Sequence, residues 1–305
     1  MLIREKMMTT SFSPAEQQLV NFVLSQTQRL SSMTVQQLAD ENFVHPSTLI
    51  RVAKKLGYSG WVQLKEDYLK EEDYLSGHFQ EVDANLPFSV TDGIMTIAKK
   101  MAALELSTIE DTLALVDHDQ LNTAKQMLLQ AEHIKIFGSN ANRLISQDFA
   151  LKMNRIGKMV THNASGEGSY EAYNLPDNSC GLLISYTGEN TGLVQVARIL
   201  KQRQIPVIVI TSIGENTLAD IGDSCLRLTT RERLYSKIGN FSINKSVCYL
   251  LDLLYSCVFA DNYPHNLNHL IEMGEQIDKR KTSSAVMTEG PVEKVVQFKD
   301  SFRPN

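Results

Sequence analysis

Residues 34–65 read TVQQLADENFVHPSTLIRVAKKLGYSGWVQLK, and the fold of the N-terminal part follows from them. Thr34 and Gln37 have the spacing of a helix capping box, and apolar residues follow on one face of a short helix. After a turn, Pro46 suits the first position of a second helix, and Gly57 suits the position just beyond its end. Two short helices joined in this way predict a helix-turn-helix.

The second helix of such a motif enters the major groove of DNA. Its outward side chains here carry hydroxyl or cationic groups, which suit base edges and phosphates. The predicted DNA-binding residues are His45, Ser47, Thr48, Arg51, Lys54 and Lys55. The net charge of the chain is −5, but residues 42–65 contain no Asp or Glu. A small helical bundle with a merely solvated polar face is the alternative.

Further helices are expected on both sides of this motif. Ser13 and Glu16 form another predicted capping box, and a fourth helix is expected from Trp61 to Tyr74. Trp61, Leu64 and Tyr68 form an apolar stripe on it, which fits either a subunit contact or local core packing.

Beyond residue 132 the pattern alternates between strands and helices. Strands are expected at 134–138, 159–162, 181–185, 207–211 and 226–228, and helices at 141–156, 192–203 and 241–259. Such alternation predicts a parallel sheet covered on both faces. The expected division is a DNA-binding domain (1–76), a linker with connecting helices (77–131), an α/β domain (132–262), and a C-terminal helix with a polar tail (263–305).

Composition narrows the class of protein. The start of the chain lacks the apolar stretch of a signal peptide, and no apolar run approaches the ~20 residues of a membrane span. The four cysteines have neither a Cys-x-x-Cys spacing nor a companion His cluster, which predicts buried free thiols. We expect a cytoplasmic protein that has no metal, no cofactor and no membrane partner.

Two predicted loops follow strands and precede helices, where ligands bind in parallel α/β sheets. Hydroxyls, backbone N–H groups and a helix N-terminus at such a place suit a phosphate. The predicted ligand-binding residues are Ser139 and Asn140 in the first loop and Ser185, Thr187, Gly188, Asn190 and Thr191 in the second. The same residue types are also common in ordinary turns.

The helix-turn-helix segment closely resembles that of RpiR-type (MurR/RpiR) regulators. The residues that fit the family pattern are Leu38-Ala39, Val44, Ser47-Thr48, Arg51, Lys54-Lys55-Leu56-Gly57, Gly60 and Leu64-Lys65. His45 stands where the family usually has a capping serine. Because histidine caps poorly, this departure implies a less firm helix start or a direct contact of His45 with DNA.

Residues 130–260 resemble the SIS (sugar isomerase) domain, which implies a flavodoxin-like parallel α/β sandwich. The family's phosphate loop reads Ser-x-Ser-Gly-x-Thr, and here Thr187 and Asn190 replace its second serine and its threonine. Gly138-Ser139-Asn140 is a looser match to the first loop of the family. The resemblance implies a regulator that binds an operator in double-stranded DNA as a homodimer or homotetramer and responds to a phosphorylated sugar.

An enzyme is the competing interpretation. Isomerase chemistry needs a positioned base, and Glu232 lies where SIS isomerases place a catalytic glutamate. We expect Glu232 to bind a sugar hydroxyl instead, and no residue to be catalytic. The alternative is a sugar-phosphate isomerase with a helical assembly domain. A basic, acid-free recognition helix favours the regulator, because an enzyme has no use for one.

Overall fold

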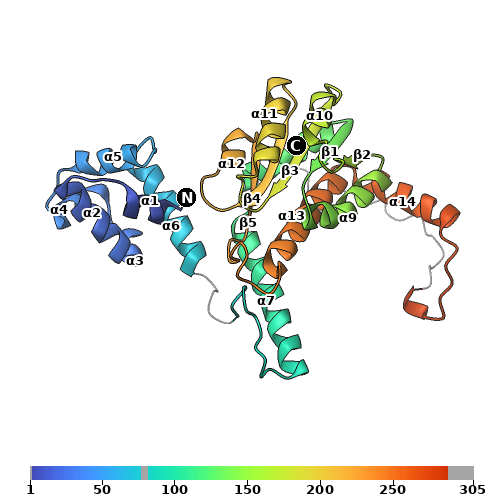
Figure 1. Ribbon diagram of the computed structural model, residues 1–305, viewed down its shortest axis with the longest axis horizontal. Coiled ribbons are helices and arrows are strands. Elements are labelled where there is room, and N and C mark those ends of the chain that lie inside the picture. The colour runs from blue at the N-terminus through green and yellow to red at the C-terminus, as the bar shows by residue number, and fades with distance from the viewer. Residues whose placement is uncertain (1, 77–81, 288–305) are drawn as a thin grey trace.

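The computed structural model describes residues 2–76 and 82–287 (Figure 1). A helical N-terminal part precedes a C-terminal part built on a parallel sheet, so the predicted fold class is confirmed. The expectations for the first residues of the linker and for most of the polar tail fall on residues 77–81 and 288–305, outside the described residues.

Six helices form the N-terminal part within the described residues. They are α1 (Ile3–Thr9), α2 (Pro14–Ser25), α3 (Thr27–Leu30), α4 (Val35–Glu41), α5 (Pro46–Lys55) and α6 (Trp61–Ser76). Both predicted capping boxes are present, at Ser13 and at Thr34. Trp61, Leu64 and Tyr68 are all buried in the core that these helices share, so local packing explains the apolar stripe on α6.

The C-terminal part contains five parallel strands in the order β2-β1-β3-β4-β5. They are β1 (His133–Phe137), β2 (Met159–His162), β3 (Ser179–Ser185), β4 (Val207–Ser212) and β5 (Ser224–Leu228). This strand order is that of a flavodoxin-like sheet, whose ligands bind beyond the carboxyl ends of the strands. All seven residues of β3 are buried, as expected for a central strand covered on both faces.

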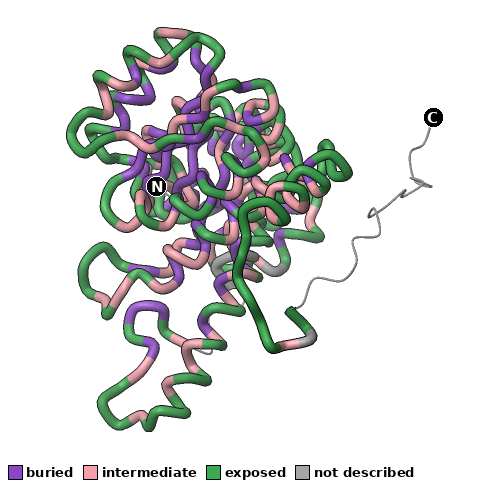
Figure 2. The backbone as a smooth tube through the Cα atoms, turned by 90° about the vertical axis from the view of Figure 1, so that its right-hand side faces the viewer, coloured by how far each residue is buried: buried purple, intermediate pink, exposed green. Residues whose placement is uncertain are grey.

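Alternate strand residues point to opposite faces of the sheet, and each face has its own helices. One face is covered by α8 (His118–Gln130), α9 (Ala141–Arg155) and α13 (Phe241–Asp261). The other face is covered by α10 (Gly168–Tyr173), α11 (Thr191–Gln202) and α12 (Thr217–Ile221). Buried residues accordingly fill the inside of this sandwich and of the N-terminal helical part, and buried backbone concentrates in the middle of the molecule (Figure 2).

Two further helices flank the sandwich. α7 (Ile94–Ala114) precedes it and packs on α13, and α14 (Tyr263–Ile277) follows α13. Among the described residues, α13 alone is long and apolar enough to cross a membrane by composition, with a mean hydropathy of 1.3. Eight of its residues are buried in the structure, a pattern typical of a core helix.

The cysteines follow the prediction only in part. All four are free, and burial raises the pKa of the Cys180 thiol to about 12. Cys225 and Cys257 are half-buried, whereas Cys248 is exposed. The apolar surroundings of Cys248 in the sequence are misleading because α13 turns this residue away from the sheet.

Candidate functional site

The candidate recognition helix α5 is fixed at both ends. His45 is its N-terminal cap, because Nδ1 accepts a hydrogen bond from the backbone N–H of Ser47 at 3.2 Å and lies 2.9 Å from the Ser47 hydroxyl. At the other end, Gly57 has a φ of +93°, and the N–H groups of Gly57 and Tyr58 donate to the carbonyls of Lys54 and Ala53. These are the two bonds of a Schellman motif. The histidine therefore does cap the helix, in place of the family's serine.

The outward face of α5 presents polar and cationic groups. Ser47, Arg51 and Lys54 are exposed on it, as the sequence predicts. Ile50 is also exposed, at 46%. Ile50 was not among the predicted DNA-binding residues, because an apolar residue on a helix is first expected in the core. An exposed apolar group at this place suits the methyl group of thymine.

Two residues expected to face DNA have other partners in the structure. Thr48 is only 2% exposed, and its hydroxyl accepts a hydrogen bond from the guanidinium of Arg51 at 2.9 Å. The Lys55 ammonium lies 2.6 Å from the carboxylate of Glu16. Lys55 thus ties α5 to α2, and Thr48 holds the side chain of Arg51 from below.

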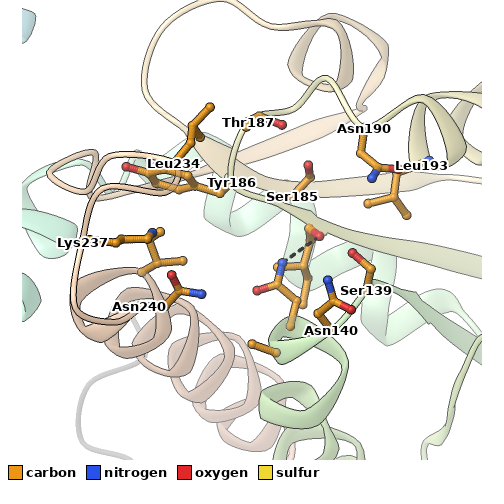
Figure 3. Close-up of a pocket in the computed structure, with 14 residues that line it drawn as sticks. Ser139, Asn140, Ser185, Tyr186, Thr187, Asn190, Leu193, Leu234, Lys237 and Asn240 are labelled. Carbon is orange, nitrogen blue, oxygen red and sulfur yellow. Dashed lines mark hydrogen bonds between the residues drawn. The ribbon is translucent and has the colours of Figure 1, made fainter. Parts of the chain in front are cut away.

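A pocket of about 260 Å³ opens at the carboxyl edge of the sheet (Figure 3). Its lining comes from the β1–α9 loop, the β3–α11 loop and the segment between β5 and α13. The lining residues are Ser139, Asn140, Ala141, Asn142, Ile184, Ser185, Tyr186, Thr187, Asn190, Leu193, Leu234, Lys237, Asn240 and Ile243. This lining contains one charged side chain, Lys237, and no Asp, Glu or His.

Polar groups of the β3–α11 loop are held in place by bonds within it. The Ser185 hydroxyl accepts from the N–H of Gly188 at 3.2 Å, and the Thr187 hydroxyl accepts from the N–H of Glu189 at 3.3 Å. Each hydroxyl keeps its own proton available for a ligand. Asn190 caps α11, because its side-chain oxygen accepts from the N–H of Leu193 at 3.0 Å. The positive end of the α11 dipole therefore lies at the pocket.

The β1–α9 loop forms the opposite wall. Asn140 has a φ of +50°, a conformation that few residues other than glycine adopt. Asn142, at the start of α9, donates from its side-chain nitrogen to the carbonyl oxygen of Ile184 at 3.2 Å, which joins this helix to the end of β3. Ser139 lies beside Asn140 at the mouth of the same pocket.

The third wall is residues 229–240, which we call the pocket loop. Its Lys237 ammonium lies 2.9 Å from a carboxylate oxygen of Glu232, and both side chains are nearly buried. The other oxygen of Glu232 accepts from the N–H groups of Ser242 and Ile243 at the start of α13. The Tyr186 hydroxyl donates to the backbone carbonyl of Glu232 at 2.7 Å.

The structure brings together five of the predicted ligand residues and leaves three outside the pocket lining. Ser139, Asn140, Ser185, Thr187 and Asn190 lie on the pocket. Gly188 lies behind its lining, Thr191 is exposed beside it, and Glu232 bonds to the start of α13 and to Lys237. Both carboxylate oxygens of Glu232 thus have hydrogen-bond partners within the protein.

Four polar residues of the pocket lining were not among the predicted ligand-binding residues. They are Asn142, Tyr186, Lys237 and Asn240. Lys237 and Asn240 lie on the segment that follows β5. Ligands bind beyond the carboxyl ends of parallel strands, and this reason for choosing the other two loops applies equally to the end of β5. The expected strand at 226–228 already carried this signal.

Two separate parts of the chain match the models of known protein families. Residues 1–73 match the model of the helix-turn-helix domain of the rpiR family, and residues 127–256 match that of the SIS domain. The fold and pocket therefore define a two-domain protein with a helix-turn-helix and a flavodoxin-like SIS domain. The chain thus joins a helix-turn-helix domain of the rpiR family to a SIS domain.

Two similar proteins align over nearly the whole chain, and a third aligns over part of it. An uncharacterized HTH-type transcriptional regulator of Caldanaerobacter subterraneus is 24% identical, over 93% of this chain and 98% of its own. The Vibrio vulnificus NanR protein complexed with ManNAc-6P aligns with a TM-score of 0.55 and 19% identity, over 90% of this chain and 97% of that one. A putative sugar-phosphate isomerase from Listeria monocytogenes aligns at 0.52 and 13% identity, over 61% of this chain and 98% of that one.

Proposed function

We propose that the chain is a DNA-binding transcriptional regulator whose SIS domain binds a phosphorylated sugar or amino sugar and thereby changes its affinity for an operator. The observation that carries the ligand class is the pocket. It combines the Ser185 and Thr187 hydroxyls, the N-terminus of α11 and the ammonium of Lys237. A helix N-terminus and a cation together suit a phosphate dianion.

The lining of the pocket favours a sensor over an isomerase. Sugar isomerisation requires a general base beside the substrate, and the described lining residues include no carboxylate or imidazole. Glu232 is the nearest candidate by sequence, but both of its carboxylate oxygens already accept hydrogen bonds. We therefore propose that the protein is not an enzyme. Turnover of a sugar phosphate by the purified wild-type protein would overturn this.

The second half of the proposal rests on α5. Arg51, held from below by Thr48, suits a bidentate contact with guanine, and Lys54 suits a phosphate. His45 and Ser47 lie at the exposed N-terminal turn of α5, where recognition helices contact base edges. We propose His45, Ser47, Ile50, Arg51 and Lys54 as the DNA-reading set. Thr48 and Lys55 support this set indirectly, because Thr48 bonds to Arg51 and Lys55 bonds α5 to Glu16 of α2.

A gel-shift assay tests the whole proposal. The protein is incubated with DNA from upstream of its own gene, with and without a panel of hexose and hexosamine 6-phosphates that includes ManNAc-6P. At least one sugar phosphate should change the DNA affinity. An Arg51→Ala/Lys54→Ala variant with wild-type DNA affinity would show that α5 is not the reading helix.

Calorimetry tests the pocket separately. A Ser185→Ala/Thr187→Ala variant loses two hydroxyl donors, each worth about 1.5–3 kcal/mol toward a charged group. Its sugar-phosphate affinity should therefore fall at least ~100-fold, since about 1.4 kcal/mol corresponds to a factor of ten. Thr191→Ala is the matched control, because Thr191 begins the same helix outside the lining. An unchanged sugar-phosphate affinity in the Ser185→Ala/Thr187→Ala variant would place the ligand elsewhere.

We also propose that the protein acts as a homodimer or homotetramer in the cytoplasm. One helix-turn-helix buries little DNA surface, and paired half-sites are the usual remedy. The first turn of α7 supports an interface, because Ile94 and Met95 are 85% and 70% exposed there. Light scattering on the full chain should give at least twice the mass of 34.3 kDa. A monomer at micromolar concentration in the presence of DNA would contradict this.

A further inference from the structure

The segment that connects the two domains is bonded directly to the pocket loop. Asn85 belongs to this segment, before α7, and is only 8% exposed. Its side-chain oxygen accepts from the N–H of Arg233 at 2.7 Å, and its side-chain nitrogen donates to the carbonyl of Arg231 at 3.3 Å. Its backbone carbonyl accepts from the N–H of Ile238 at 2.9 Å. Three hydrogen bonds thus join one residue of the segment to residues 231–238.

Asn85 is itself held in a fixed orientation. A carboxylate oxygen of Asp83 accepts from the backbone N–H of Asn85 at 2.8 Å and from its side-chain nitrogen at 3.1 Å. The hydrogen bond from the Asn85 backbone is the main reason that the pKa of Asp83 lies below its ordinary value. Asn85 is therefore held on two sides, by Asp83 within the segment and by residues 231 and 233 of the pocket loop.

On its other side, the same loop faces the ligand pocket. Leu234 and Lys237 line the pocket, and Lys237 is bonded to Glu232 (Figure 3). The backbone of Glu232 receives the Tyr186 hydroxyl. Lys237 lies one residue before Ile238, whose N–H is bonded to Asn85. The loop therefore lies between the pocket and the connecting segment, with direct bonds to both.

A second contact joins the loop to the helix that continues from this segment. The guanidinium of Arg231 donates to the Ser107 hydroxyl at 3.0 Å and forms an ion pair with Asp111, both residues of α7. The side chains of Arg231 and Asp111 are 3% and 4% exposed. The base of the loop is thereby fixed to α7, and Asn85 holds the part that reaches the pocket.

From these contacts we infer that Asn85 is a positioning residue: it sets the pocket loop for ligand binding and carries the state of that loop to the segment that leads to the DNA-binding domain. The inference rests on the proposed function and assigns the route of its regulation. A phosphate that draws Lys237 away from Glu232 changes the backbone next to Ile238, and the bonds to Asn85 pass the change to the segment. A ligand shifts such an equilibrium only by binding one loop state better than the other.

Hydrogen exchange of the full chain without ligand is the first test. Asn85→Ala removes both side-chain bonds to the loop and should raise amide exchange in residues 231–238. Asn154→Ala is the matched control, because Asn154 also bonds a backbone segment through both ends of its amide, at Val160 on β2. Asn154→Ala should leave exchange in residues 231–238 unchanged. Unchanged exchange in Asn85→Ala overturns the inference, whether or not the protein binds any sugar phosphate.

Ligand binding and DNA binding are the second test. A residue with a merely structural role would leave the ligand affinity and its effect on DNA affinity unchanged. With ManNAc-6P and inorganic phosphate as probes, Asn85→Ala should bind about tenfold more weakly, as the loss of two side-chain hydrogen bonds implies. The ratio of its DNA affinities with and without ligand should fall toward one. Its DNA affinity without ligand should stay at the wild-type value. Equal ligand affinities and equal coupling in Asn85→Ala and Asn154→Ala overturn the inference. Failure of the wild-type protein to bind either probe overturns the proposed ligand instead, and exchange still decides the positioning role.

Discussion

At the scale of single residues, the shape of the pocket depends on groups that never touch its interior. Gly188 has a φ of +67°, and a Cβ there would lie 1.9 Å from the side-chain oxygen of Asn216. That oxygen caps α12 by accepting from the N–H of Ala219 at 3.0 Å. The side chain of Asn216 therefore cannot move away without leaving a helix end uncapped. The neighbouring loop alone is therefore a sufficient reason for a glycine at this position.

Gly188→Ala should consequently destabilise the protein and weaken its ligand binding. We expect about 1–2 kcal/mol for the left-handed backbone and a further ~1 kcal/mol for the displaced cap. Thermal unfolding and calorimetry measure the two effects. Gly192→Ala is the control, since the closest atom to its added Cβ is at 3.4 Å and its φ is not positive. Similar losses in both variants would contradict the steric argument.

At the scale of elements, two adjacent lysines of α5 have different functions. Lys54 is exposed on the outward face, whereas Lys55 bonds to Glu16 of α2. Lys54→Ala should weaken binding to all DNA sequences, lower the salt dependence by about one ion and leave stability unchanged. Lys55→Ala should lower the melting temperature and affect DNA binding less. Salt-dependent binding and thermal unfolding of both variants test this. The reverse assignment of effects would mean that α5 is oriented differently on DNA.

The same ion pair predicts how the N-terminal domain responds to acid. The hydrogen bond from Lys55, followed by that from the Ser13 backbone, lowers the pKa of Glu16 from 4.5 to about 2. A carboxylate whose pKa is lowered in the folded state stabilises the fold at any pH above the pKa that the group has in the unfolded chain. This contribution is lost as the pH falls from about 5 toward 2. Glu16→Gln should be less stable than wild type at pH 7, and this difference should shrink with falling pH. A constant difference across this range would refute the assignment.

Elements with a strong sequence signal were predicted well, and short elements were not. The strand at 207–211 matches β4 to within one residue, because residues 207–210 are apolar without interruption, and the helix at 241–259 matches most of α13, because periodicity over such a length is clear. α3 and α12 have only four and five residues, which is too short for any period to be detected. Within the pocket, the two loops rich in hydroxyl and amide groups were predicted, but Lys237 was not. Its position depends on the pairing with Glu232, and local sequence carries no trace of that contact.

At the scale of the whole molecule, the apolar cores of the N-terminal part and of the sandwich come from separate stretches of the chain. The N-terminal core uses residues 3–68, and those of the sandwich use residues 124–258. Lys6 of α1 forms an ion pair with Glu215 in the loop after β4. The Lys6 side chain is 18% exposed and that of Glu215 57%. A single partly exposed ion pair contributes about 0–1 kcal/mol, which is too little to hold one domain orientation when DNA or ligand binding favours another. The connecting segment is therefore the stronger link between the two parts.

A regulator built in this way must show reciprocal coupling. If a sugar phosphate changes the operator affinity by some factor, the operator must change the sugar-phosphate affinity by the same factor, typically about 5–150-fold. Two titrations measure it: DNA into protein with and without saturating ligand, and ligand into protein with and without DNA. Because both factors describe one thermodynamic cycle, they should agree within error. Equal ligand affinity with and without the operator would leave the pocket without any influence on DNA binding, and the sensor interpretation would then be wrong even if both ligands bind tightly.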